Sequence, residues 1–310
     1  MMDRKKIMAR SIPGLLLCTI FFTAAIHADK VFTFNPPDGK KGSVTITTTT
    51  RRQLDDNQPV VDVVEKKWDI TFRKKEDHFI QTWKPVSVQT SRDGREFVHP
   101  VHTVLHQFPV TYTIDLQGNI LSVEGLAGVQ DAMEGKVPER AWHSLAPLIS
   151  EDMLAGIEKK DWKVLVEDCL GKPAKKGISW HHMETQGMAK REGRPYFRYV
   201  RVKQPIHYAG RDLLMLEEFR YTGLEALEKV STGKKDMFTG EEIEEVRAWQ
   251  GEEGIRIEVE GRGSRVLDPD TMLIYFASLT QKEHKTFKNS EGKESVLKIE
   301  ETREYRFTYQ

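Results

Sequence analysis

The sequence predicts a mainly β protein of the α+β class, with long curved antiparallel sheets in two similar halves and a helical segment between them. Over several long segments, apolar and polar residues alternate with a period of two, which places one face of a strand on a core and the other in water. Turn-forming residues separate these segments. Helical spacing of apolar residues is confined to the middle of the chain.

Long strands are expected wherever the alternation persists. In the clearest case Trp68, Ile70 and Phe72 alternate with polar residues, and the threonine-rich run 45–50 also favours a strand. The long strands are predicted over 59–75, 78–90, 271–288 and 295–309. These exceed the ~5–6 residues of a typical strand, which predicts a wide and strongly curved sheet.

Turn signals connect the predicted strands. Asn289-Ser290-Glu291-Gly292 is typical of a hairpin between the last two strands. Asp115-Leu116-Gln117-Gly118 and Asp268-Pro269-Asp270 predict two further hairpins.

Helices are expected at 126–133 and 138–158, whereas the state of 159–169 remains open. Ser150 is a favourable N-cap, and the acidic residues that follow it suit the positive end of a helix dipole. Gly171 and Pro173 are expected to end the helical region.

Residues 1–28 predict a secretory signal peptide that is cleaved near Ala28, with Ala25 as the second choice. A positive segment that ends at Arg10 precedes an uncharged apolar run with small residues at its end. An uncleaved anchor is the alternative, but the uncharged stretch is shorter than the ~20 residues that a spanning helix needs. Lipidation of Cys18 is disfavoured because bulky Leu17 precedes it. The mature chain is therefore expected to be periplasmic or secreted and not to span a membrane.

The mature composition excludes some classes of protein. Cleavage removes four basic residues and one acidic residue, so the formal charge falls from 0 to −3, which disfavours nucleic-acid binding. Only Cys169 remains, so an internal disulfide is excluded and the core must come from apolar burial.

The predicted organisation is a first β-rich half over 29–125, a helical spacer over 126–170 and a second β-rich half over 171–310. A weak internal repeat supports the two halves, because Lys-Lys-Gly segments lead into strands at Gly42 and Gly177 and strand–Asp-x-x–strand patterns surround Asp115 and Asp268. The unequal spacing of these landmarks predicts an insertion in the second half, within the polar stretch 223–252.

The segment GKPAKKGISW at residues 171–180 resembles the Pro-basic-Gly-x-Trp start of the second half in a family of exported bacterial β-rich proteins of unknown function. The closing stretch from Gly261 is similar to the last hairpins of that family. The resemblance implies a fold type and an envelope location. It implies no activity and no site residues.

His99, His102 and His106 form the densest histidine cluster. An extended conformation is expected here because Pro100, two valines and Pro109 disfavour a helix, and a strand would divide the three rings between its faces. A metal site needs three or four converging ligands, so the sequence predicts no metal and no catalytic role for this cluster.

Other motifs are interpreted as structural. His181 and His182 are adjacent on a predicted strand and therefore face opposite sides. Gly261-x-Gly263 lacks the context of a dinucleotide loop and is interpreted as a bend or bulge. Asp268 is assigned to a turn rather than to a calcium loop, and Cys169 to a buried apolar position.

These observations favour a non-enzymatic envelope protein without a cofactor, whose curved sheet and crossing helix hold an apolar small molecule or lipid. A structural or interaction module that binds an envelope protein partner by strand addition is the alternative. A metal-dependent hydrolase is the least favoured class, because no catalytic, cofactor or metal-ligating residues are assigned.

Overall fold

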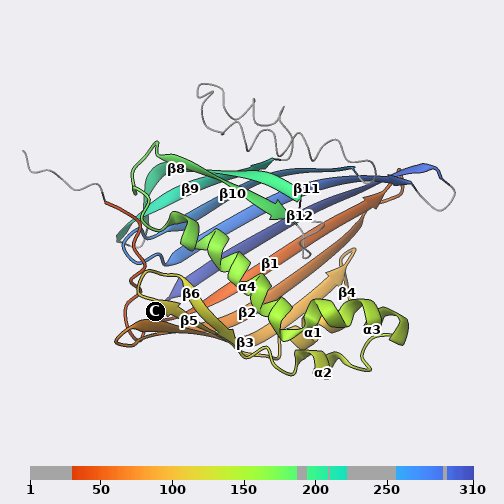
Figure 1. Ribbon diagram of the computed structural model, residues 1–310, viewed down its shortest axis with the longest axis horizontal. Helices are drawn as coiled ribbons and strands as arrows, with labels where there is room; N and C mark the ends of the chain where they lie inside the picture. Colours follow the sequence, from red (N-terminus) through yellow and green to blue (C-terminus); the bar gives the residue numbers. More distant parts are fainter. Residues whose placement is uncertain (1–29, 187–193, 209, 222–255, 289–291) are drawn as a thin grey trace, which may run out of the picture.

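The structure is a computed structural model that describes residues 30–186, 194–208, 210–221, 256–288 and 292–310. In these residues, twelve strands form one antiparallel sheet, confirming the predicted mainly β class. The strand order is β6-β5-β3-β2-β1-β12-β11-β10-β9-β8-β7, with the short β4 beside β3. The first and last strands of the chain are therefore neighbours in the middle of the sheet (Figure 1).

Most of the strands are long, as the alternation predicted. The strands are β1 (Lys41–Leu54), β2 (Val60–Lys74), β3 (His78–Arg92), β4 (Arg95–Glu96), β5 (Val110–Asp115), β6 (Ile120–Glu124), β7 (Ser179–Gln186), β8 (Arg194–Tyr208), β9 (Arg211–Tyr221), β10 (Arg256–Leu267), β11 (Ile274–Lys288) and β12 (Glu294–Tyr309).

The helices lie on one side of the sheet. They are α1 (Pro100–Leu105), α2 (Val129–Met133), α3 (Glu139–Leu145), the 3-10 turn η1 (Ala146–Ile149), α4 (Glu151–Leu165) and the 3-10 turn η2 (Glu167–Cys169). Helix α4 crosses one face of the sheet, and α1 to α3 gather near its N-terminal end (Figure 1). We call the face that α4 crosses the helix-covered face.

The core lies between the helices and the apolar part of the helix-covered face. It contains aromatic and aliphatic residues of both strand groups and of the helices, among them Phe34, Trp68, Ile70, Phe79, Ile114, Met133, Trp162, Val200, Leu216 and Leu267. The aromatic rings contact one another, as Trp162 does with Phe34 at 5.6 Å between ring centroids. Among the described residues, no helix combines the length and apolarity needed to cross a bilayer.

Both predicted Asp turns are hairpins. Asp115 Oδ1 accepts hydrogen bonds from the N–H groups of Gln117 and Asn119 between β5 and β6, and Asp268 Oδ1 accepts one from Asp270 between β10 and β11. The β5–β6 hairpin ends the strand order, whereas β10–β11 lies within it, so the two turns occupy different places in the sheet. The internal repeat of the two halves stays a prediction.

Three predictions fall outside the described residues. They are the signal peptide over 1–28, the insertion within 223–252 and the central positions of the 289–292 turn. The open stretch 159–169 is helical as far as Leu165 and continues as η2.

Candidate functional site

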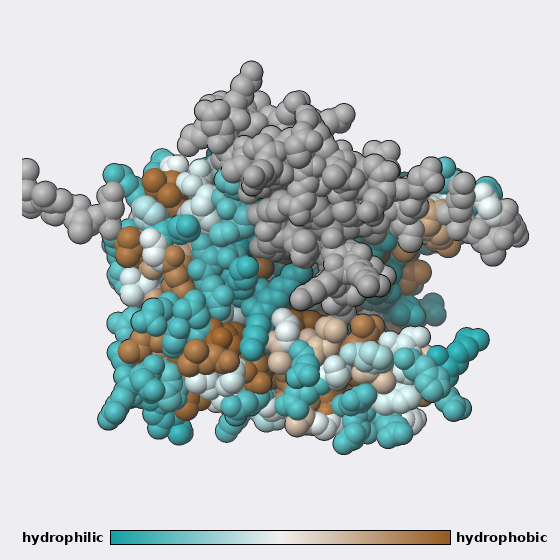
Figure 2. Space-filling view, in the orientation of Figure 1, coloured by the Kyte–Doolittle hydropathy of each residue, from teal (hydrophilic) through white to brown (hydrophobic). Residues whose placement is uncertain are grey.

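A cavity of about 800 Å³ lies between α4 and the helix-covered face of the sheet. Its described lining includes the apolar residues Met153, Ile157, Val164, Leu165, Ala277, Leu279 and Ile299. It also includes the charged residues Arg52, Lys160, Asp161, Glu218, Arg220, Arg265, Glu283, Glu301 and Arg303. Around α4 the described surface is similarly mixed, with hydrophobic and hydrophilic residues side by side (Figure 2). The cavity therefore offers both apolar and ionic contacts.

Helix α4 is fixed over the sheet by the residues on its opposite side. Trp162 is buried, and its Nε1–H donates a hydrogen bond of 2.9 Å to the carbonyl oxygen of Gly118. The hydroxyl of Tyr112 on β5 donates to Glu158 Oε2 at 2.6 Å. Burial raises the pKa of Glu158, although the bond from Tyr112 opposes this shift. These contacts hold α4 so that its other side faces the cavity.

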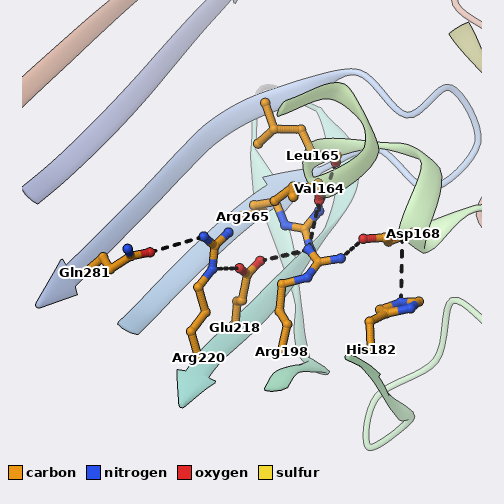
Figure 3. Close-up of polar contacts among 9 residues, drawn as sticks. All are labelled: Val164, Leu165, Asp168, His182, Arg198, Glu218, Arg220, Arg265 and Gln281. Atoms are coloured by element: carbon orange, nitrogen blue, oxygen red, sulfur yellow. Dashed lines mark hydrogen bonds and ion pairs between the residues drawn. The ribbon is translucent and has the colours of Figure 1, made fainter. Parts of the chain in front are cut away.

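Five buried charged residues meet at the C-terminal end of α4, and we call them the arginine cluster. They are Asp168 of η2, Arg198 of β8, Glu218 and Arg220 of β9, and Arg265 of β10 (Figure 3). Arg198 is completely buried and forms ion pairs with Asp168 and, at 3.5 Å, with Glu218. Segments far apart in the sequence are thus joined by charge-assisted contacts.

Two arginines of the cluster cap α4. Arg265 Nη1 donates to the carbonyl oxygens of Val164 and Leu165 at 2.6 and 2.9 Å, and Arg198 Nη1 donates to that of Val164 at 3.2 Å (Figure 3). The last carbonyls of a helix have no intrahelical partner, and positive charge is favourable at this end of the dipole. The cluster therefore fixes the end of α4 above β8 and β10.

Glu218 is the central anion of the cluster. Burial by itself would raise its pKa, but the positive charges of Arg220, Arg198 and Arg265 outweigh burial and hold the pKa at about 2. Burial lowers the pKa of Arg198 to about 10, which still leaves this guanidinium charged at neutral pH. Glu218 and Arg198 are therefore both charged near pH 7.

Gly261 makes room for Arg220, which corrects the bend or bulge predicted at Gly261-x-Gly263. The pairing of β10 with β11 is regular through both glycines, and its register shifts only at Val266/Leu267. A Cβ on Gly261 would lie 3.0 Å from Arg220 Cβ. Because this side chain is absent, Arg220 can lie across β10 and donate to Glu218 at 2.7 Å and to Gln281 at 3.4 Å.

The extended conformation predicted for the three histidines is wrong, because Pro100–Leu105 forms helix α1. Pro100 occupies the first turn of α1. A backbone N–H in this turn has no partner within the helix, so its absence in proline costs nothing, and the fixed φ of proline suits a helix. The rings of His99 and His102 are 4.5 Å apart, whereas His106 packs edge-on against Trp68 at 4.3 Å.

The histidines are uncharged at neutral pH. Burial lowers the pKa of His102 to about 3 and that of His106 to about 4, and the nearby charge of Lys66 adds to both shifts. Within the described ranges, no three His, Cys, Asp or Glu side chains are grouped as metal ligands would be. The absence of a bound metal stays a prediction.

The paired histidines and Cys169 occupy the structural positions that the sequence predicts. His181 and His182 are consecutive in β7, and His182 Nε2 lies 3.9 Å from Asp168 Oδ1, next to the arginine cluster. Cys169 is completely buried.

The arginine cluster is not evident from the sequence, because its members come from four separate elements. One local signal was present. In β9 the apolar run Leu213–Leu216 continues directly into Glu217 and Glu218, so at least one carboxylate had to face a covered side of the sheet and needed cationic partners.

No protein-family model matches the chain, and no curated protein matches it. Among solved structures, one described as lipid–protein interactions in lipovitellin is similar over 89% of this chain, with a TM-score of 0.50 and 10% identity. The match covers 26% of the lipovitellin chain, so this chain spans about a quarter of its length. A protein from Bacteroides fragilis NCTC 9343, described as exported and YmcC-like in fold, matches over 87% of this chain and 97% of its own, with a TM-score of 0.23 and 7% identity. At this level of identity, the likeness to lipovitellin shows only that this chain shares its fold with the matched part of that protein.

Proposed function

We propose that this protein is a non-enzymatic carrier of the cell envelope that holds one amphipathic molecule of the lipid class in the cavity beneath α4. The observation that best supports this proposal is the cavity. Its volume of about 800 Å³ lies within the roughly 300–1,000 Å³ of pockets that hold one small molecule. A single bound molecule is therefore favoured over a bulk store of lipid.

Of the apolar small molecule or lipid predicted from the sequence, the mixed lining favours an amphipathic lipid. Met153, Ile157 and Leu279 offer apolar contacts to a hydrocarbon chain. An apolar molecule that filled the whole cavity would also cover the exposed guanidinium groups of Arg52 and Arg303 and remove them from water, which is unfavourable. A molecule with a polar head satisfies both kinds of lining.

The likeness to lipovitellin supports a lipid-class ligand, because that structure is described by its lipid–protein interactions. Cleavage of the predicted signal peptide would place the carrier in the periplasm or outside the cell. We also propose that the chain belongs to the family of exported β-rich proteins that its sequence resembles.

Titration with fluorescent fatty acid tests the carrier function. We expect the delipidated protein to bind one equivalent, and Gly156→Trp to weaken this binding, because Gly156 lines the cavity and a Cβ there would meet no described atom within 4 Å. Lys159→Trp is the matched control, since this exposed residue of α4 does not line the cavity. If the wild type shows no saturable binding, the carrier proposal is wrong.

A further inference from the structure

Arg52 offers hydrogen-bond donors at the edge of the cavity. It lies on β1 and lines the cavity, and its side chain is 51% exposed. Its Nη1 donates to Asp62 Oδ2 at 3.0 Å, and this is its one hydrogen bond among the described residues. The rest of the guanidinium edge therefore remains available to a ligand.

The charge of Arg52 is only partly neutralised, because Asp62 is shared. Arg92 holds the same carboxylate with two hydrogen bonds, from Nε at 2.7 Å and from Nη2 at 3.3 Å. Two guanidinium groups thus face one carboxylate. A guanidinium binds carboxylate or phosphate oxygens through parallel N–H groups, so a second anion is favourable at Arg52.

The acidic residues that line the cavity already have cationic partners. Arg303 Nε lies 2.7 Å from Glu301 Oε1, and Arg303 Nη1 lies 3.5 Å from Asp161 Oδ2. Glu283 Oε2 lies 2.9 Å from Lys285 Nζ. These carboxylates are therefore engaged elsewhere and do not neutralise Arg52.

The helix side of the cavity edge is open and carries another cation. Gly156 and Lys160 are exposed, lie one turn apart on α4, and both line the cavity. Because Gly156 has no side chain, a head group can approach the helix backbone there. The apolar lining begins beside these residues, with Ile157 on α4 and Ile299 directly opposite Arg52 on β12.

We propose that the bound amphiphile has an anionic head, a carboxylate or a phosphate, which Arg52 binds at the edge of the cavity while the hydrocarbon chain lies between α4 and strands β11 and β12. This inference rests on the proposed carrier function and specifies the class of its ligand.

Binding of oleate and oleyl alcohol to delipidated protein tests the head group, because the two ligands share one chain and differ in charge. We expect oleate to bind about tenfold more tightly, as hydrogen bonds to a charged group predict. Arg52→Gln should remove this preference and leave the affinity for oleyl alcohol within about twofold, as expected when the apolar contacts are untouched. The variant should fold, because Asp62 keeps both bonds from Arg92.

Arg51→Gln is the matched control. Arg51 is the neighbouring arginine of β1, and it lines a separate small pocket with Lys282 and Lys298 on the other face of the sheet. This variant changes the net charge equally but should leave the binding of both ligands unchanged. Equal effects of the two substitutions, or equal binding of oleate and oleyl alcohol by the wild type, would overturn the assignment of the head group while leaving the carrier function intact.

A phosphate series separates a lipid head from a free anion. We expect lysophosphatidate to bind in a manner that depends on Arg52. We expect inorganic phosphate alone to show no detectable binding that depends on Arg52. Inorganic phosphate that binds as tightly as lysophosphatidate would show a free-anion site and contradict the proposal. If the wild type binds none of the amphiphiles, both the head-group assignment and the carrier function are wrong.

Discussion

Arg265 Nη1 donates a hydrogen bond of 2.6 Å to the carbonyl oxygen of Val164. The arginine lies on β10 and is 3% exposed, and Val164 lies one residue before the end of α4. This contact joins the second strand-rich segment to the helix that covers the cavity. The Arg265 side chain therefore contributes both to the stability of the fold and to the position of the helix that covers the candidate site.

Replacement of this arginine should destabilise the protein. Arg265→Gln removes one cation from Glu218 and the cap from α4, and loss of one partner of a buried ion pair costs about 3–5 kcal/mol. We expect a decrease of that order in the free energy of unfolding, measured by urea denaturation. Arg262→Gln, an exposed position on the same strand, should stay within about 0.5 kcal/mol of the wild type. Equal losses in the two variants would contradict the capping role.

The low pKa of Glu218 predicts acid sensitivity. Its pKa is about 2 in the folded protein, whereas the ordinary value for a glutamate is 4.5, so its stabilising contribution is complete above pH 4.5 and is lost as the pH falls towards 2. Glu218→Gln should lower stability at pH 7 and flatten the decrease between pH 4.5 and 2. Urea midpoints measured across this range test the effect, and parallel profiles for the two proteins would contradict it.

His106 should contribute a second acid-sensitive step at higher pH. Its pKa of about 4 lies below the ordinary value of 6.5, so the unfolded chain takes up a proton first and stability is lost as the pH falls from 6.5 towards 4. His106→Phe keeps an aromatic ring against Trp68 and should reduce the slope of this part of the profile, while the contribution of His102, whose pKa is about 3, remains. His143→Phe, at an exposed position of α3, is the control and should leave the profile unchanged. A slope in His106→Phe equal to that of the wild type would show that His106 does not contribute to this step.

Gly156→Ala should stabilise the protein. Glycine inside a helix costs roughly 0.5–1 kcal/mol relative to alanine. The new Cβ would meet no described atom within 4 Å. By contrast, Gly118→Ala should destabilise, because Gly118 has φ +95° and the Cβ would lie 2.7 Å from Phe34 Cβ. Thermal unfolding of both variants checks the two signs, and destabilisation by Gly156→Ala would indicate a backbone role for this glycine.

The strands were predictable because each alternation is local. Trp68, Ile70 and Phe72 predict β2 from their own spacing, and all three are buried in the core. Helix α1 was not predictable in this way, since the same Pro100 that excludes a strand interior also suits the first turn of a helix.

The candidate site depended on long-range pairing that spacing does not reveal. Arg198, Glu218 and Arg265 meet only because β8, β9 and β10 are neighbours in the sheet and α4 ends above them. Gly261 is interpreted from the sequence as part of a bend or bulge, whereas it leaves room for the side chain of Arg220 on the neighbouring strand β9. Such roles depend on register, which one sequence does not determine.

The carrier function is tested most directly by native mass spectrometry of mature protein purified without detergent, followed by solvent extraction and lipid analysis. We expect one anionic amphiphile for each chain in the wild type and in Lys159→Trp, and a clear loss of this ligand in Gly156→Trp. An unliganded wild-type chain that also takes up no amphiphile on incubation with lipid vesicles would contradict the proposed function.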